Sequence, residues 1–315
     1  MKYRLFGLLL LSFSFAIGQN ATSDSIPKKW RLKAIYGLNG TQTQFVNWNA
    51  GGRNNISALS FINSQANYKF QKIKWDNEFN IALGGLQYLD GDQAGEQTMF
   101  QKTDDKIELS SNVGYKLKKE LNLSFIAGFR TQMLDGFNYP NDSIRASTFM
   151  APGYFNLGLG LDYTPGNKLT VFASPAALKV TVVKDVTLAN AGAFGLDGGE
   201  FDDLGNLITP GKQVRFEAGS YVKVNYTTSV AKNIDLKSKI ELFSNYLENP
   251  QNIDINAEVL WSFKVNSWFS ASLQWNLIYD DDIIIRDANG NSGPRTQFKS
   301  VLGLGISYTM KNFVK

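Results

Sequence analysis

The side chains of this 315-residue chain that could do chemistry are carboxylates and amines, because the sequence contains neither histidine nor cysteine. Hydrolases that pair a serine or cysteine nucleophile with a histidine base are therefore excluded. Paired carboxylates can act without histidine, as they do in glycoside hydrolysis. Whether the acids of this chain form such pairs depends on what surrounds them.

Acidic and basic residues share the polar positions of the same segments. The candidate acids are Asp76, Glu78, Glu108, Glu217, Glu241 and Glu258, and lysines and arginines are interleaved with them. An acid beside a base in a narrow interior is most simply neutralised by it. We therefore predict no enzymatic activity and a charge network in the interior that consists of Arg130, Arg215, Glu217, Lys223, Lys237, Lys239, Glu241 and Glu258.

An acidic run, Asp280, Asp281 and Asp282, is followed by Asp287 and two asparagines. These oxygens could bind calcium, or bridge anionic phosphates through a divalent ion. The spacing matches a calcium loop only in part, since glycine stands at 290 rather than 292. The alternative is an acidic loop that is solvated or stabilises a turn. No other cofactor is expected.

Trp48, followed by Gly51 and Gly52, lies in a polar stretch. An exposed indole flanked by amides could stack on a sugar or pack on a partner. The alternative is a loop that folds back over the rest of the protein.

The elements that must position these residues are β-strands. Ile253, Ile255, Ala257, Val259, Trp261, Phe263 and Val265 alternate with the polar residues Asp254, Asn256, Glu258, Ser262 and Lys264, and the pattern restarts after a short turn at Phe269. This period of two is typical of a strand with one apolar and one polar face. The strands have about ten residues or more, which is enough to cross a hydrocarbon layer at a tilt.

Similar segments recur along the chain, joined alternately by short lysine-rich turns and long acidic loops. A soluble β-sandwich does not require this alternation. The pattern predicts an all-β fold, a closed antiparallel up-and-down transmembrane β-barrel of about twelve strands over residues 30–315. A mean hydropathy of −0.21 agrees with it, because the inner face of such a barrel is polar. Pro175 predicts a bulge or an edge-like position in one strand.

The first residues have the features of an export signal. Lys2 and Arg4 precede an apolar stretch, and Ala16-Ile17-Gly18 offers a cleavage site. We predict a signal peptide over 1–18, a short periplasmic segment over 19–29, and both termini of the barrel in the periplasm.

Several segments resemble a family of uncharacterised outer-membrane barrels of Bacteroidota, classed as a domain of unknown function. They are residues 45–52, 102–106, 149–152, 174–175, 192–195, 243–246, 250–254 and 278–282. The resemblance covers nearly the whole mature chain and implies the fold and an outer-membrane location. The family has no established activity to carry over.

Composition limits the partners. The net charge of +4 is spread along the chain, so nucleic acid is not an expected partner. The expected partners are outer-membrane lipid, lipopolysaccharide and other outer-membrane proteins. We predict an accessory subunit of an assembly or secretion complex, with the bulky residues Phe61, Phe172, Tyr221 and Phe243 filling the lumen. The alternative is a narrow porin-like channel for small polar solutes.

Overall fold

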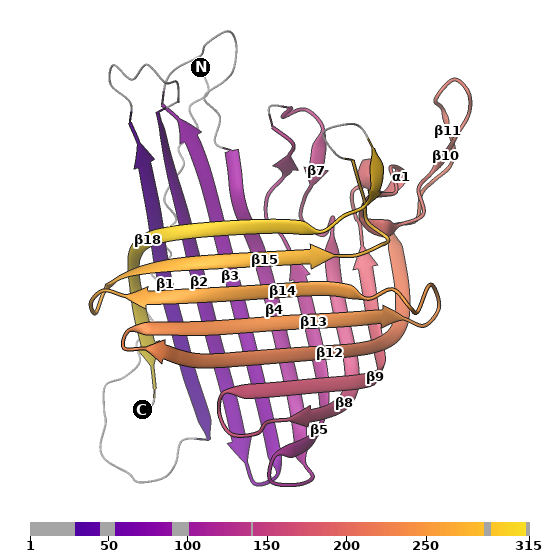
Figure 1. Ribbon diagram of the computed structural model, residues 1–315. Coiled ribbons are helices and arrows are strands. Elements are labelled where there is room, and N and C mark those ends of the chain that lie inside the picture. Colours follow the sequence, from indigo (N-terminus) through magenta and orange to yellow (C-terminus); the bar gives the residue numbers. More distant parts are fainter. Residues whose placement is uncertain (1–28, 45–53, 90–100, 140, 287–290, 313–315) are drawn as a thin grey trace.

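The computed structural model describes residues 29–44, 54–89, 101–139, 141–286 and 291–312. Twelve long strands close into one antiparallel barrel in the order β1-β18-β15-β14-β13-β12-β9-β8-β5-β4-β3-β2 (Figure 1). The predicted fold class is confirmed. The bounds of these strands are Trp30–Thr43 (β1), Asn55–Phe70 (β2), Ile73–Tyr88 (β3), Gln101–Lys116 (β4), Leu121–Thr131 (β5), Gly153–Tyr163 (β8), Leu169–Val182 (β9), Val214–Ala231 (β12), Ile234–Asn245 (β13), Asp254–Lys264 (β14), Phe269–Tyr279 (β15) and Gln297–Lys311 (β18).

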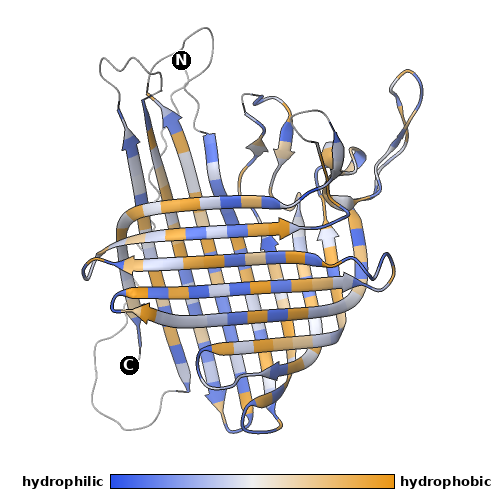
Figure 2. Ribbon diagram, viewed as in Figure 1, coloured by the Kyte–Doolittle hydropathy of each residue, from blue (hydrophilic) through white to orange (hydrophobic). Residues whose placement is uncertain are grey.

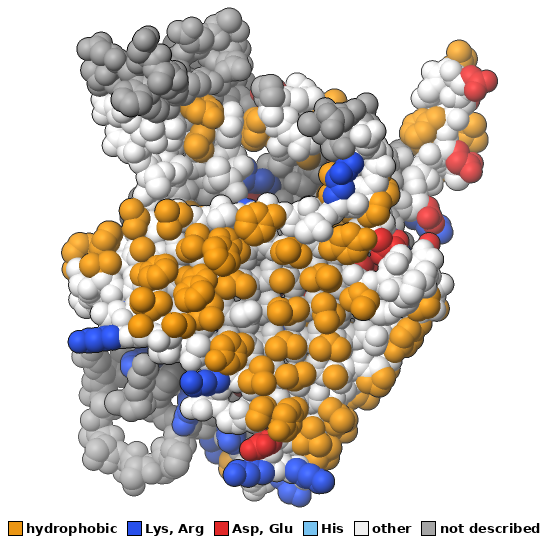
Figure 3. All heavy atoms as spheres, in the orientation of Figure 1, with side chains coloured by type: hydrophobic (Ala, Val, Ile, Leu, Met, Phe, Trp, Pro, Cys, Tyr) orange, Lys and Arg blue, Asp and Glu red, His pale blue; other side chains and the backbone are white. Residues whose placement is uncertain are grey.

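The outer face of the barrel is apolar. Leu38, Phe125, Leu159 and Leu302 are among the exposed large side chains, and they alternate with inward polar residues. Figure 2 shows this alternation along the strands, and Figure 3 shows apolar side chains spread over the face formed by β12 to β15 and β18. An apolar surface of this extent on a closed barrel is stable in lipid, so the chain forms a transmembrane barrel of the outer-membrane type.

Short turns join the strands at one end of the barrel. They follow β2, β4, β8, β12 and β14, and the start of β1 pairs with the end of β18 at the same end. Gln71 and Asn233 have positive φ values in the two tightest of these turns, at 52° and 66°. The predicted alternation of short and long connections is therefore confirmed, whereas the side of the membrane on which the termini lie stays a prediction.

The long loops at the other end contain short elements of their own. They are β6 (Gly136–Phe137), β7 (Arg145–Ser147), α1 (Val186–Asn190), η1 (Ala193–Gly195), β10 (Glu200–Phe201), β11 (Leu207–Thr209), β16 (Ile284–Arg286) and β17 (Ser292–Pro294). The β10–β11 hairpin projects away from the barrel (Figure 1). No helix among the described residues is long and apolar enough to cross a membrane.

The predicted bulge at Pro175 is present. Ala177 pairs with Gly219, whereas Ser174 pairs with Tyr221, so β9 has one extra residue at this point relative to β12. The Ser174 hydroxyl donates a hydrogen bond to the Leu159 carbonyl at 2.8 Å. A bulge lets proline sit in the strand without breaking the ladder on both sides.

The seam between β1 and β18 is only partly closed. The two strands pair from Lys33 and Lys311 to Asn39 and Gly305, while β18 continues to Gln297 along β15 alone. In Figure 1, β18 bends away from β1 and crosses the front of the barrel. The loop-side half of β18 therefore presents a backbone edge that has no strand partner among the described residues.

Candidate functional site

The middle of the lumen is filled by aromatic side chains. Phe172, Tyr221 and Phe243 come from three neighbouring strands and pack with Ile126 from β5 in one buried cluster. The rings of Phe172 and Tyr221 lie 6.1 Å apart, and the Tyr221 hydroxyl donates a hydrogen bond to Glu241 at 2.7 Å. The interior of a barrel of this size is wide enough for side chains to fill.

Ion pairs join opposite walls at nearly the same level. Lys106 Nζ on β4 lies 3.2 Å from Glu258 Oε2 on β14, and five strands separate β4 from β14 either way round the barrel. Lys239 Nζ on β13 lies 2.6 Å from Glu108 Oε1 on β4. Contact across the full diameter means that these side chains, together with the aromatic cluster, form a partition across the lumen.

Seven of the eight residues of the predicted charge network make ion pairs, as follows: Arg215 with Glu217, Lys223 with Glu241, Lys237 with Glu78, Lys239 with Glu108, and Glu258 with Lys106. These pairs form separate clusters rather than one network. Arg130, the eighth residue, makes no ion pair among the described residues.

A chamber of about 570 Å³ lies in the lumen on the loop side of the partition. Its floor includes Tyr221 and Phe243, and its walls come from β4, β5, β8, β14, β15 and β18. Gln297 and Phe298 at the open edge of β18 also line it. The chamber therefore reaches the seam as well as the loop end. In Figure 3 a recess above β18 contains basic side chains.

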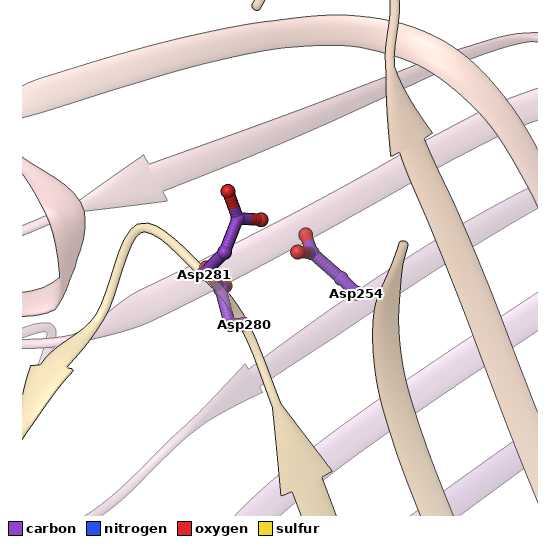
Figure 4. A group of neighbouring side chains, drawn as sticks. All are labelled: Asp254, Asp280 and Asp281. Carbon is purple, nitrogen blue, oxygen red and sulfur yellow. The ribbon is translucent and has the colours of Figure 1, made fainter. Parts of the chain in front are cut away.

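The acidic run folds toward the lumen instead of standing in solvent. Asp280 and Asp281 follow β15, and Asp254 at the start of β14 lies beside them, so that one carboxylate oxygen of each lies within 4.8 Å of the others (Figure 4). The Lys179 ammonium lies 2.6 Å from Asp254 and 3.1 Å from Asp280. It also lies 3.4 Å from Glu217. This ammonium supplies the positive charge that a metal ion would bring, and the predicted calcium site stays a prediction.

Asp282 has a different partner from the other two aspartates of the run. Its carboxylate accepts a hydrogen bond from Arg215, which also donates to the Gly195 carbonyl at 2.8 Å. Burial raises the pKa of Asp282 above its ordinary value, and the charge of Arg215 acts in the opposite direction. Arg215 thus fastens two long loops to the barrel rim.

Of the residues in this cluster, the sequence interpretation missed Lys179 and also Asp254. In the sequence Asp254 is one polar residue in the alternation of its strand. The available signal was the hairpin register, which places Ile255 opposite Tyr279 and therefore puts Asp254 next to Asp280.

Three polar side chains on the wall opposite this acidic cluster have no such partners. Arg130 on β5 pairs in register with Tyr154 on β8, and Asn156 follows two residues later on the same face. The guanidinium lies over the Tyr154 ring, 4.9 Å from its centroid. All three side chains line the chamber, and none of them makes a hydrogen bond or ion pair with another described residue. We call Arg130, Tyr154 and Asn156 the donor wall.

Several predicted features lie outside the described residues: Trp48, Gly51, Gly52, Asp287, and the signal peptide over 1–18. The predicted contact role of the first three and the predicted cleavage stay predictions.

Two family models match parts of the chain. A family described as a protein of unknown function, DUF3078, matches residues 41–137, and a second one, also described as a protein of unknown function, DUF481, matches residues 202–284. Both matches agree with the resemblance to an uncharacterised family. The bacterial group named in that resemblance stays a prediction. No curated protein matches the chain.

Solved barrels cover most of the chain at low identity. The translocator domain of the autotransporter NalP from Neisseria meningitidis is 9% identical over 90% of this chain and 90% of its own, with a TM-score of 0.35. An outer membrane channel from Pseudomonas putida F1 is 12% identical over 92% and 98%, with a TM-score of 0.39. The toluene transporter TodX from P. putida is 10% identical over 91% of both chains, with a TM-score of 0.30. Similarities this distant carry no functional argument, and the fold rests on the strand pairing above.

Proposed function

We propose that the chain is a sealed, non-enzymatic outer-membrane barrel that serves as an accessory subunit of a larger outer-membrane protein complex. The observation that carries the proposal is the partition, in which Lys106 and Glu258 meet across the barrel diameter at 3.2 Å above a buried aromatic cluster. A passage for solutes would have to break these ion pairs in a partly desolvated interior, where they are costly to separate.

The chemistry of the lumen supports the absence of catalysis. Glu108, Glu241 and Glu258 are each within 4.0 Å of a lysine, so they lack the free acid and base pair that carboxylate catalysis requires. The chain has no histidine that could replace them.

The projecting β10–β11 hairpin supports a role as a subunit. Leu204 at its tip is 88% exposed and Ile208 is 64% exposed, and Phe201 beside them is also exposed. An isolated two-stranded hairpin is marginally stable, and clustered apolar side chains outside the membrane mark a contact surface. Glu200, Asp202 and Asp203 frame this surface and favour a partner with basic residues.

A narrow channel is the second candidate, and one observation favours it. On the short-turn side of the partition, Lys237 and Glu78 keep 44% and 34% of their side-chain surface exposed, so solvent reaches the lumen from both ends. Only side chains separate the two sides. A rearrangement of the partition would open a small polar passage.

Conductance in planar lipid bilayers tests the proposal. The wild-type barrel should give no steady single-channel steps at any applied voltage. A Lys239→Ala, Glu108→Ala double variant removes one of the two crossing pairs and keeps the charge balance. It is the positive control, because single-channel steps from this variant show that the measurement detects a weakened partition. Steady steps from the wild type would overturn the sealed barrel and support the channel.

The subunit role has a separate test. Site-specific photo-cross-linking in intact cells from a probe at Leu204 should give one discrete protein adduct, which an Ile208→Ser variant reduces. A probe at Leu159 on the lipid face serves as the matched control. Equal labelling from both positions would contradict the docking role of the hairpin.

A further inference from the structure

The charged side chains that line the chamber differ in one respect. Each of them except Arg130 has an oppositely charged partner within 4.0 Å among the described residues. The lysines contact carboxylates, and each carboxylate contacts a lysine. Arg130 lies over the ring of Tyr154 and makes no ion pair, although Glu108 is its register partner on β4. A cation without an ion pair of its own in a chamber that is otherwise internally paired is available to an anion from outside.

The neighbours of Arg130 are suited to the same anion. Tyr154 and Asn156 carry a hydroxyl and an amide that make no hydrogen bond within the described chain, and they face the chamber from the adjacent strand. Arginine presents five N–H donors in a planar fork that matches the oxygens of a carboxylate or a phosphate. The Tyr154 ring holds the guanidinium plane in place, because the cation stacks on its face.

The opposite wall favours cations, so within the chamber an anion is directed to Arg130. Asp254 and Asp280 share the single Lys179 ammonium and keep net negative charge. Glu108 is the register partner of Arg130, but its carboxylate is already paired with Lys106 and Lys239. A volume of about 570 Å³ fits one small organic molecule.

We propose that the donor wall is a binding site for a small organic anion, which Arg130 holds through its carboxylate or phosphate oxygens while Tyr154 and Asn156 complete the hydrogen bonds. The site goes beyond the proposed subunit role and does not depend on the lumen being sealed.

Two routes lead to this site, one for each possible carrier of the anionic group. A free solute would enter from the loop end. A lipid headgroup would enter through the open half of the seam, where Gln297 and Phe298 line the chamber and the exposed apolar residues Phe298 and Leu302 face the bilayer. Its acyl chains would then remain in the membrane.

The experiment uses the full chain, refolded in detergent for one arm and placed in nanodiscs for the other. In the first arm, glycerol 3-phosphate and succinate are titrated by calorimetry. In the second arm, nanodiscs with equal amounts of phosphatidylglycerol and phosphatidylcholine are examined by native mass spectrometry for retained lipid. A solute site gives saturable heat, and a headgroup site gives selective retention of phosphatidylglycerol.

In whichever arm binding is seen, Arg130→Gln should weaken it by about tenfold or more, because a charge-assisted pair of hydrogen bonds is lost. Tyr154→Phe should weaken it by about fivefold through the loss of one hydroxyl. Lys212→Gln, which removes an exposed lysine that is not part of the chamber lining, should leave binding unchanged and is the matched control.

Heat-modifiable mobility on gels reports the folding of each variant, and Arg130→Lys replaces Arg130→Gln if the latter does not fold, since it keeps the charge and removes the fork. The proposal is overturned if neither arm shows binding, or if the binding seen is unchanged in the arginine and tyrosine variants. The conductance measurement is independent of both results, so failure of this site and failure of the sealed barrel are told apart.

Discussion

Two walls of one chamber use charged residues in opposite ways. On the acidic wall, Asp254, Asp280 and Glu217 share the Lys179 ammonium, and every charge there contributes to holding strands β9, β12, β14 and β15 together. On the donor wall, Arg130 makes no ion pair, and its polar neighbours Tyr154 and Asn156 make no hydrogen bond with other described residues. The difference separates charges that stabilise the barrel from charges that remain available for a ligand.

Lys179→Met tests the acidic wall and has the largest expected effect. The change leaves three carboxylates without their common cation in an interior where Lys179 is only 12% exposed. We expect the free energy of unfolding to fall by about 3–5 kcal/mol, as it does when one partner of a buried pair is removed. Urea unfolding in lipid vesicles, followed by tryptophan fluorescence, measures this. The loss should shrink at low pH, because protonation removes the charges that are left unpaired.

Lys212→Met is the matched control for that experiment. Lys212 lies 2.6 Å from Asp197, the same distance as Lys179 from Asp254, but it is 70% exposed. An exposed pair contributes at most about 1 kcal/mol. Similar losses in the two variants would show that burial does not set the strength of the acidic wall.

Much of the fold follows from the sequence, since period two sets which side chains face lipid and loop length sets which ends of the strands lie together. The acid-to-base pairing does not follow in the same way. Lys106 pairs with Glu108 on its own strand and with Glu258 across the lumen, and the second pair depends on the width of the barrel, which no local pattern records. Lys102 and Asp105 illustrate the same limit at the start of β4. They pair with each other within the strand, yet Asp105 also accepts two backbone N–H groups of the loop after β5, from Met133 and Leu134.

For the candidate site, too, the sequence predicts where residues lie but not which charges pair. The sequence interpretation assigned Arg130 to a neutralising network in the lumen, because acids surround it in the strand pattern, and the structure places it in the chamber lining. Only the three-dimensional positions show that those acids are taken by Lys106, Lys239 and Lys223. A free charge and a paired charge have the same sequence pattern.

Asp185→Ala tests how much a paired charge contributes to local stability when it lies in a loop. The Asp185 carboxylate accepts a hydrogen bond from the Leu188 amide at 3.0 Å and pairs with Arg145. The backbone hydrogen bond, together with Arg145, lowers the pKa of Asp185. We expect a local loss of about 1 kcal/mol, typical of an N-cap, seen as faster hydrogen exchange at the Leu188 amide.

The pH dependence of this contribution has a defined sign. Since the pKa of Asp185 is lower in the folded chain, its stabilisation is present above the unfolded pKa of about 3.9 and is lost as the pH falls through the folded pKa. The exchange rates of wild type and Asp185→Ala should therefore converge on acidification. Asp185→Asn keeps the capping oxygen, and its Leu188 exchange should stay near the wild-type value at neutral pH; a rate equal to that of the alanine variant would show that the charge, not the cap, is what matters.

Arg130→Gln has the smallest expected effect on stability, and this result sharpens the comparison of the two walls. The substitution breaks no ion pair. It removes the stacking of the guanidinium on Tyr154, which contributes less than about 1 kcal/mol to stability. The same urea unfolding should therefore place this variant close to the wild type and far from Lys179→Met. A loss of several kcal/mol would mean that Arg130 stabilises the barrel after all, and the distinction between a paired wall and a free wall would fail. If the variant stays stable while it loses the anion, the barrel retains a cation that its own structure does not need, which is the expected property of a side chain kept for a ligand.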